Sequence, residues 1–368
     1  MDEQISGRLE LTGARARVLL GRGVRTGTNG SSAESTGGGS RPPDDSDARL
    51  IAARIVRHSL IDAAAASAIA VEIVDRAHAA IARLEETTTD AGLSDADALA
   101  LESVIHVRGR PALRVFANRL ESLEQHPGSE LWQTFIADYE ERIVTAATAT
   151  GAAIVSVFDS GYPPWVQGSA WLIATDRVVT NRHVLVSDNV NLVEPTGDGS
   201  AIRFRTGHAV EIEFAADDRT PATNIRRRVT NVLYVAQRGD PVDIAVLAIE
   251  PVNDRIPLEL VKPPSSAPRN LFVVGHPAPM TSAPDAVKAV FGNPDGRKRV
   301  SFGKRLDIAT RAGDIVHDAS TIGGYSGAPV VAISDGAVAG LHYYGDPIGG
   351  NLAAAAATIR AHAAHQYW

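Results

Sequence analysis

The stretch Gly324-Tyr325-Ser326-Gly327-Ala328-Pro329 places a serine between glycines, just before an apolar run. Two further stretches lie upstream of it: Val178–Leu185, which reads Val-Val-Thr-Asn-Arg-His-Val-Leu, and Asp243–Leu247, which reads Asp-Ile-Ala-Val-Leu. Each has the short, β-branched, apolar character that predicts a β-strand. A histidine, an aspartate and a serine therefore follow one another along the chain, each at or beside a predicted strand. These are the side chains that nucleophilic acyl transfer requires.

The order His183, Asp243, Ser326 is that of the chymotrypsin-type triad and differs from the orders in subtilisins and α/β-hydrolases. On these residues the chain resembles the trypsin-like serine peptidases, especially the bacterial branch of glutamyl endopeptidases and intracellular trypsin-like peptidase domains. The resemblance implies a serine endopeptidase in which Ser326 is the nucleophile, His183 the general base and Asp243 the group that holds the imidazole tautomer. It also implies an oxyanion hole formed by the N–H groups of Gly324 and Ser326.

Each fragment alone has a simpler interpretation. His183 suits a core or surface histidine, Asp243 suits a turn aspartate before a buried strand, and the serine stretch suits a hairpin turn. Their order within a β-rich region favours the catalytic interpretation. Asp240 is a rival for the acid, but it precedes Pro241 and has no apolar run directly after it, so we expect Asp243.

Tyr325 departs from the family pattern. In trypsin itself the residue before the nucleophile is an aspartate that pairs with a newly formed N-terminus, and bacterial relatives often carry asparagine there. A tyrosine cannot form that ion pair, so activation by burial of a new α-amino group is not expected. The same departure favours an alternative class of function, a catalytically inactive protease-fold module that binds an extended peptide of a partner protein.

The resemblance places the specificity pocket in two segments, 320–323 and 340–345. Ser320 stands where trypsin-type enzymes carry an aspartate for basic side chains. An arginine or lysine at the P1 position, on the acyl side of the scissile bond, would have no counter-ion there.

Thr321 and His342 match the threonine and histidine with which glutamyl endopeptidases bind an acidic side chain, so the resemblance implies an acidic P1 preference. The alternative is a strand that simply carries a partly buried histidine. Tyr343, Tyr344 and Gly345 would pair with the substrate backbone as an added strand.

Composition limits the location, partners and cofactors that we expect for the protein. The 368 residues carry a net charge of −7, which gives no general attraction to nucleic acid or to anionic membranes. The chain has no cysteine, no apolar run long enough to span a bilayer, and no basic and apolar regions of a signal peptide after Met1. We therefore expect a cytoplasmic protein with a protein or peptide substrate, no membrane partner and no nucleic-acid partner. His362 and His365 lack cysteine or carboxylate partners nearby, so we predict no metal and no cofactor.

The texture of the chain predicts three parts. Residues 1–46 end in a Gly/Ser-rich run and predict a flexible segment and linker. Residues 47–128 predict a small helical accessory module, with Asp62 and Ser94 as N-caps and a strand at Ala112–Phe116. This module is a candidate site for a regulatory partner.

Residues 129–368 predict the peptidase domain. It starts with a helix capped by Ser129 and ends with an alanine-rich helix from Asn351 to about His365. The fold expected from pattern and resemblance together is mainly β: a chymotrypsin-like double β-barrel with a C-terminal helix, preceded by the helical module. The predicted strands are Ala153–Phe158, Ala170–Ala174, Arg177–Thr180, Asn191–Val193, Val210–Phe214, Asn231–Ala236, Ile244–Ile249, Asn270–Gly275, Lys298–Gly303, Ala328–Ile333 and Ala337–His342.

Overall fold

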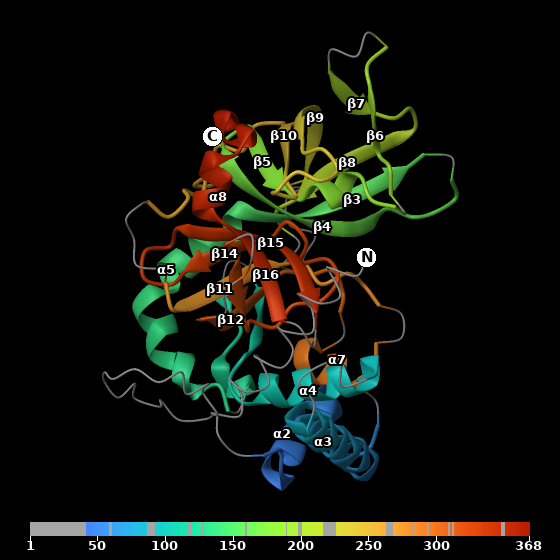
Figure 1. The fold of residues 1–368 in the computed structure, drawn as a ribbon, viewed down its shortest axis with the longest axis vertical. Helices are drawn as coiled ribbons and strands as arrows, with labels where there is room; N and C mark the ends of the chain where they lie inside the picture. Colours follow the sequence, from blue (N-terminus) through green and yellow to red (C-terminus); the bar gives the residue numbers. More distant parts are fainter. Residues whose placement is uncertain are drawn as a thin grey trace.

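In the computed structural model, two β-barrels lie one above the other and a helical module lies beyond the second barrel, away from the first (Figure 1). The residues described are 42–58, 61–86, 93–116, 119–126, 128–158, 160–188, 190–197, 201–215, 226–262, 268–280, 283–292, 294–307, 310, 313–346 and 350–368. The predicted linker up to residue 41 and the predicted break at 87–92 lie outside them. None of the helices in these ranges is both long enough and apolar enough to cross a membrane.

The first barrel is closed by six antiparallel strands in the order β10-β5-β4-β3-β8-β9, with β9 pairing back to β10. Val, Ile and Ala side chains of these strands fill its interior. The strands are β3 (Thr150–Val157), β4 (Trp165–Ala174), β5 (Arg177–Thr180), β8 (His208–Glu213), β9 (Arg226–Val235) and β10 (Ala245–Ile249), and the extension beside β9 consists of β6 (Val193–Pro195) and β7 (Ile202–Phe204).

The second barrel is closed in the order β11-β14-β15-β16-β13-β12, with β11 pairing back to β12. Two strands from upstream of both barrels, β1 and β2, extend its sheet beside β12. The strands are β1 (Ala112–Phe116), β2 (Arg119–Leu120), β11 (Asn270–Gly275), β12 (Arg299–Leu306), β13 (Ile315–His317), β14 (Pro329–Ala332), β15 (Val338–Asp346) and β16 (Gly350–Ala355).

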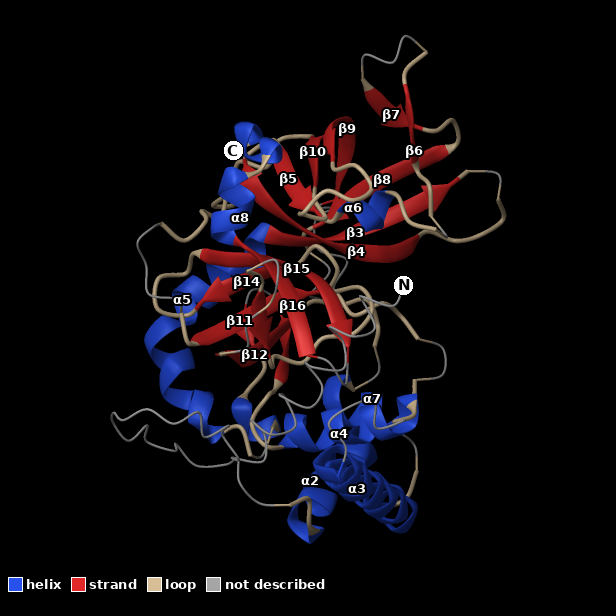
Figure 2. Ribbon diagram, viewed as in Figure 1, coloured by secondary structure: helices blue, strands red, loops and turns tan. Residues whose placement is uncertain are grey.

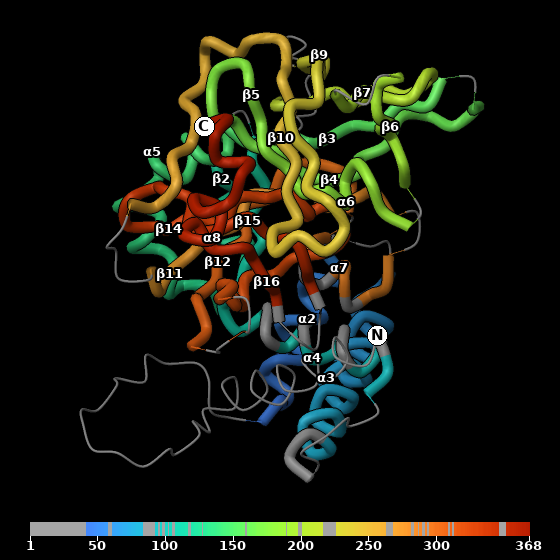
Figure 3. The backbone as a smooth tube through the Cα atoms, turned by 45° about the horizontal axis from the view of Figure 1, so that its top comes forward, coloured from blue at the N-terminus to red at the C-terminus, as the bar shows by residue number. Residues whose placement is uncertain are grey.

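The module comprises α2 (Asp45–His58), α3 (Ala63–Glu86) and α4 (Asp95–Val107), which share a core of their own. Its caps follow the prediction: the Asp62 carboxylate accepts the Ala65 N–H at 2.8 Å, and the Ser94 hydroxyl accepts the Asp97 N–H at 3.2 Å. Both α2 and α4 contact α7 (Asp285–Phe291), which lies between the module and the second barrel in both views (Figures 1 and 3).

The remaining helices lie outside the module, and Figure 2 shows α5 (Gln133–Ala149) and α8 (Ala356–Ala361) beside the barrels. After the second barrel the chain returns to the first, where the Arg177 guanidinium donates to the Tyr367 carbonyl and the Trp171 and Trp368 rings pack edge to face. The remaining helices are η1 (Leu123–Gln125), η2 (Glu130–Trp132), α5 (Gln133–Ala149), α6 (Arg182–Leu185), α8 (Ala356–Ala361) and η3 (Ala363–Tyr367).

The expected mainly-β double barrel is confirmed, and three predicted strands, Ala112–Phe116, Arg177–Thr180 and Asn270–Gly275, have the bounds expected. Two local predictions are wrong. Residues 351–355 belong to strand β16 rather than to a helix, because pairing with β13 and β15 completes the barrel. Ser129 makes no side-chain capping bond and is buried.

Strand β1, which the sequence analysis places in the helical module, pairs with β12 of the second barrel, and β2 pairs with β1. Leu113 and Val115 are buried in the main core of the protein. The structural edge of the helical bundle is therefore the end of α4 at Val107.

Candidate active site

His183 and Asp243 lie beside two paired strands of the first barrel. His183 lies in the one-turn helix α6 that follows β5, and Asp243 lies two residues before β10, which pairs with β5. The His183 ring donates through Nδ1 to Asp243 Oδ2 at 2.6 Å, and the His183 backbone N–H donates to Oδ1 at 3.0 Å. The Asn181 side chain also donates to the Asp243 carbonyl at 2.8 Å. One carboxylate therefore fixes the position of the histidine and favours the tautomer that donates through Nδ1, in which Nε2 is the acceptor.

Ser326 comes from the second barrel, in the turn before β14. Ser169 of β4 holds this turn: its N–H donates to the Ser326 carbonyl at 2.8 Å, and its hydroxyl donates to the Gly324 carbonyl at 2.8 Å. Gly168 lies between the segment that carries His183 and the turn that carries Ser326, since a Cβ there would lie 2.7 Å from Val184 and 2.9 Å from the Ser326 carbonyl oxygen. The absence of a side chain at Gly168 therefore lets these two segments lie close together.

The Ser326 hydroxyl and the His183 ring are not hydrogen-bonded to each other within the described residues. Catalytic contacts of this kind commonly tighten only when substrate is bound.

The turn presents two backbone donors. Among the described residues, the N–H groups of Gly324 and Ser326 have no acceptor, whereas the Tyr325 N–H donates to the Ile322 carbonyl at 3.1 Å. Gly324 has φ +98°, and a Cβ there would lie 2.2 Å from the His276 carbonyl oxygen, so this position requires glycine. Two neighbouring free N–H groups at such a turn form an anion-binding concavity.

Tyr325 is fully buried in the second barrel. Its ring lies against Gly275, where a Cβ would approach to 2.3 Å, and beside Phe291 of α7, with ring centroids 6.1 Å apart. Its hydroxyl is 2.8 Å from the Ser301 hydroxyl. Burial raises the pKa of Tyr325 well above its usual value, so the phenol stays neutral. The residue before Ser326 therefore anchors the turn by packing and a hydrogen bond, not by an ion pair.

The proposed specificity segments meet around Gly345. A Cβ on Gly345 would lie 2.9 Å from Thr321 Oγ1, 3.0 Å from Asn351 Oδ1 and 3.8 Å from His342 Nε2. The Thr321 hydroxyl donates to Asn351 Oδ1 at 2.7 Å, and the Asn351 amide donates to the Ala319 carbonyl at 2.5 Å. These contacts join the pocket segments to β16.

A second histidine backs His342. His317 Nε2 lies 3.3 Å from His342 Nδ1, and both side chains are buried. Burial, and then the neighbouring His317 and His183, hold the pKa of His342 well below its usual value. His342 is therefore a neutral ring at pH 7.

The other predicted pocket residues have structural contacts. The Ser320 hydroxyl donates to the Arg110 carbonyl at 3.2 Å. The Tyr343 hydroxyl donates to Asp314 at 3.0 Å, and Tyr343 interrupts the register of β15 against β16. Tyr344 and Gly345 follow on β15 and remain partly exposed and exposed, respectively.

Sequence reasoning missed three residues of this region. Ser169 is an ordinary strand residue by pattern, and Asn351 heads an alanine run that predicts a helix. His317 lies on β13, which is only three residues long and was not predicted. No local signal marks any of them, because each acts through contacts distant in the chain.

Two closed six-stranded barrels, with a His–Asp pair on one and a Gly-x-Ser-Gly turn on the other, define the chymotrypsin-like class. Residues 168–341 match the family described as trypsin-like peptidase domain, and this part of the chain is a trypsin-like serine peptidase domain.

Two solved structures are similar. Deg5 is 17% identical and covers 61% of this chain and 94% of its own, with a TM-score of 0.38. The inactive form of a serine-to-alanine mutant of Rv3671c from M. tuberculosis H37Rv is 16% identical and covers 62% and 92%, also with a TM-score of 0.38. No curated protein matches the chain.

Proposed function

We propose that the protein is a serine endopeptidase that cleaves protein substrates through Ser326, His183 and Asp243, by way of an acyl-enzyme. The observation that carries this proposal is the 2.6 Å contact from His183 Nδ1 to the Asp243 carboxylate, made beside the serine turn. That contact leaves His183 Nε2 free to take the Ser326 proton and later to return it to the leaving amine. Asp243 stabilises the imidazolium that forms in between.

The oxyanion is the second charge that the site must stabilise. As Ser326 Oγ bonds to the substrate carbonyl carbon, the carbonyl oxygen becomes negative. The free N–H groups of Gly324 and Ser326 supply donors for it. Collapse of this intermediate expels the amine and leaves an ester on Ser326, which water hydrolyses by the same route.

The pocket supports an acidic P1 preference. If His317 Nε2–H donates to His342 Nδ1, the remaining proton of His342 lies on Nε2, on the side of Thr321 and Gly345. A neutral ring then donates to a substrate carboxylate without a buried positive charge. The Thr321 hydroxyl, which donates to Asn351, would have to rotate to join it. Substitution His342→Leu should abolish a preference for glutamate over alanine at P1; an unchanged ratio of kcat/KM would exclude His342 from recognition.

A fluorescent fluorophosphonate probe tests the catalytic proposal. Wild-type protein should be labelled, and Ser326→Ala, which leaves the fold intact, should not. Asp243→Asn should lower the labelling rate by about 10⁴-fold, because the histidine then loses its tautomer. Labelling that survives in Ser326→Ala would exclude Ser326 as the nucleophile.

The second candidate function is an inactive protease-fold module that binds an extended peptide of a partner. The observation that favours it is Tyr325, which departs from the residue that the resembled family carries before its serine. On this alternative, wild-type protein shows no labelling, yet a peptide laid along Tyr344 and Gly345 still binds. Labelling of the wild type alone excludes it.

A second part of the proposal concerns the location of the protein, its partners and the role of the helical module. We infer a cytoplasmic protein, without nucleic-acid or membrane partners, that acts within a bacterial conflict or signalling system, and whose helical module restrains the protease or recruits a regulatory partner. Deletion of residues 1–107 keeps β1 in place and tests this role. A rise in peptide turnover would indicate restraint, and an unchanged or lower turnover would indicate recruitment or support of folding.

A further inference from the structure

The segment between the helical module and the second barrel carries an arginine that reaches the pocket wall. Arg110 lies between the end of α4 and the start of β1. Its guanidinium donates to Asp318 Oδ2 at 2.6 Å, and its backbone carbonyl accepts the Ser320 hydroxyl at 3.2 Å. One residue from outside both closed barrels therefore makes two contacts with the segment that precedes the nucleophile turn.

These contacts follow the alternating direction of side chains along an extended segment. Successive side chains of an extended segment point to opposite sides. Asp318 and Ser320 point to Arg110, whereas His317 contacts His342 and Thr321 contacts Asn351. Arg110 thus holds the back of the segment whose front faces the pocket.

The Arg110–Asp318 ion pair is nearly buried and is held in place by a further hydrogen bond. Only 13% of the Arg110 side chain and 2% of the Asp318 side chain are exposed. Asp318 also accepts the Lys304 backbone N–H of β12 at 2.6 Å, which ties its carboxylate to the barrel. Loss of the arginine would break a nearly buried ion pair, which is strongly unfavourable and should displace the segment that carries Asp318.

The segment that carries Arg110 is itself fixed by residues of the main core, outside the helical module. The Trp132 indole, which is fully buried, donates to the Gly109 carbonyl at 2.7 Å. The Arg110 guanidinium lies 5.9 Å from the centre of the Trp132 ring. The Phe302 N–H of β12 donates to the Pro111 carbonyl at 3.0 Å. Since α4 ends at Val107, three residues before Arg110, this short segment is the covalent path from the module to the pocket wall.

We propose that Arg110 is a positioning residue for substrate recognition, which sets the P1 pocket by holding Asp318 and Ser320 and thereby couples the helical module to specificity. The proposal rests on the proposed peptidase function. It assigns Arg110 no contact with substrate. Its effect should appear in the discrimination between P1 side chains and not in the reactivity of Ser326.

Arg110→Met is the test variant, and Arg108→Met is the matched control. Arg108 is two residues away, is also 13% exposed, and makes a 2.7 Å ion pair with Asp47 inside the module. Three quantities are measured on the full-length chain: the ratio of kcat/KM for the best and worst P1 side chains of the wild type, the rate of fluorophosphonate labelling, and amide hydrogen exchange over residues 317–323.

We expect Arg110→Met to reduce the P1 ratio by about tenfold to a hundredfold, since small misplacements of positioning groups have effects of that size. Labelling should change less than about threefold, and exchange over 317–323 should become faster. Arg108→Met, which breaks a contact of the module but keeps those of Asp318 and Ser320, should change all three much less. Asp318→Asn should behave like Arg110→Met, and the double variant should be no worse than either single one. Arg110→Lys, which keeps the charge, should restore part of the ratio if Arg110→Met folds poorly.

An unchanged P1 ratio and unchanged exchange in Arg110→Met would overturn the proposal. If the wild type is neither labelled nor able to cleave peptides, the peptidase function itself fails. Exchange alone then decides whether Arg110 holds the segment: faster exchange over 317–323 in Arg110→Met but not in Arg108→Met supports the coupling, and equal exchange refutes it.

Discussion

Tyr325 illustrates how the residue before Ser326 can anchor a turn by packing in place of an ion pair. Its ring fills the space left open by Gly275, and its hydroxyl pairs with Ser301 inside the barrel. The turn that carries Ser326 is therefore anchored without any newly formed N-terminus. The departure from the family pattern changes the anchor of the turn, and two of its N–H groups have no acceptor in the part of the chain that the structure describes.

Tyr325→Phe should keep the ring in place but remove the hydroxyl. The Ser301 hydroxyl then loses a buried partner, which should lower the free energy of unfolding by about 1–2 kcal/mol. Probe labelling of Ser326 should stay near the wild-type rate, because the ring still fills its site. Urea unfolding measures the first effect. Tyr162→Phe, at an exposed tyrosine, should change neither quantity, and a normal stability of Tyr325→Phe would contradict the anchoring role.

At this scale, sequence could supply the residues that stand out by type and order. The His–Asp–Ser order predicted side chains that the fold does bring to one region, and His183 and Asp243 are in contact. Ser169 and Asn351 could not be predicted, because their roles depend on which distant strand each one faces. A serine on a strand and an asparagine before five alanines carry no local mark of those neighbours.

Among the elements, β16 shows where local propensity fails. Its alanine-rich sequence favours a helix by intrinsic preference. The barrel, however, needs a strand between β13 and β15, and the ladder bonds on both sides outweigh that preference. The helix begins only at Ala356, where the pairing ends. Short strands such as β7 and β13 were missed for a related reason, since three residues carry too little pattern.

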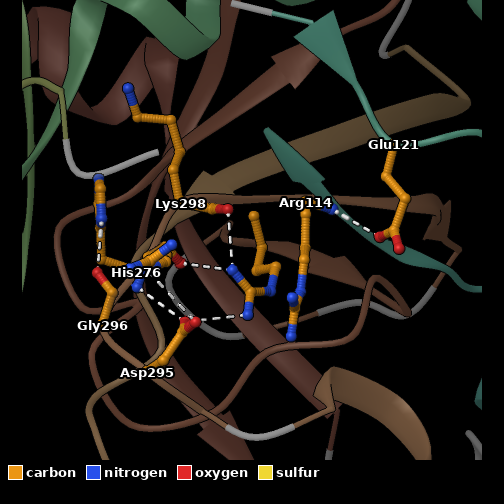
Figure 4. A network of polar contacts seen from close by, with 8 residues as sticks. Arg114, Glu121, His276, Asp295, Gly296 and Lys298 are labelled. Atoms are coloured by element: carbon orange, nitrogen blue, oxygen red, sulfur yellow. Dashed lines mark hydrogen bonds and ion pairs between the residues drawn. The ribbon is translucent and has the colours of Figure 1, made fainter. Parts of the chain in front are cut away.

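The loop after η1 joins α2 to β2 through a histidine. Arg54 of α2 donates to His126 Nδ1 at 3.2 Å, and His126 Nε2 lies 3.1 Å from Glu121. Glu121 also accepts the Arg114 backbone N–H, a contact that Figure 4 shows. Burial and the nearby arginines Arg54 and Arg57 lower the pKa of His126, although Glu121 opposes them. Glu121, despite its burial, keeps a pKa of about 2 because of its hydrogen bonds and stays ionised near neutrality.

Acidification should therefore destabilise this junction. Below about pH 6.5 the unfolded chain binds a proton at this histidine that the folded chain refuses, so stability falls as the pH drops from 7.5 to 5.5. His126→Gln, which cannot titrate, should show a smaller fall in the urea midpoint over that range. The buried His276 and His342, whose pKa values are also lowered, contribute to the fall in the urea midpoint of both the wild type and His126→Gln. The control is His78→Gln, at an exposed site on α3, whose urea midpoint should fall as much as that of the wild type. A fall in His126→Gln equal to that of the wild type would refute the role of His126.

At the scale of the whole molecule, the site exists only where the two barrels meet. The His–Asp pair belongs to one barrel and the serine turn to the other, so the distance between them depends on how the barrels are held together. Ser169 is one tie between them. Lys298 is another: it is fully buried, and its ammonium donates to the Phe214 carbonyl of the first barrel at 2.8 Å.

The base of Lys298 is held by the loop around it. Arg299 is buried beside it and donates to Asp295 and to the Lys298 carbonyl, and the Gly296 carbonyl lies 3.2 Å from the His276 ring. In Figure 4 the Lys298 side chain extends away from this cluster, toward the green ribbon of the first barrel. The loop therefore fixes one end of the side chain, and the first barrel binds the other.

Lys298→Met should loosen the alignment of the two barrels while keeping the apolar stem. The Phe214 carbonyl loses a charged donor, so the free energy of unfolding should fall by about 1–3 kcal/mol. Because His183 and Ser326 then no longer hold their relative position, fluorophosphonate labelling should slow by about tenfold or more. Lys262→Met, which removes an exposed lysine paired only with Glu259 among the described residues, serves as the control and should alter neither. A labelling rate in Lys298→Met equal to that of the wild type would show that the barrels keep the site aligned without this tie, and would leave Ser169 as the contact to test next.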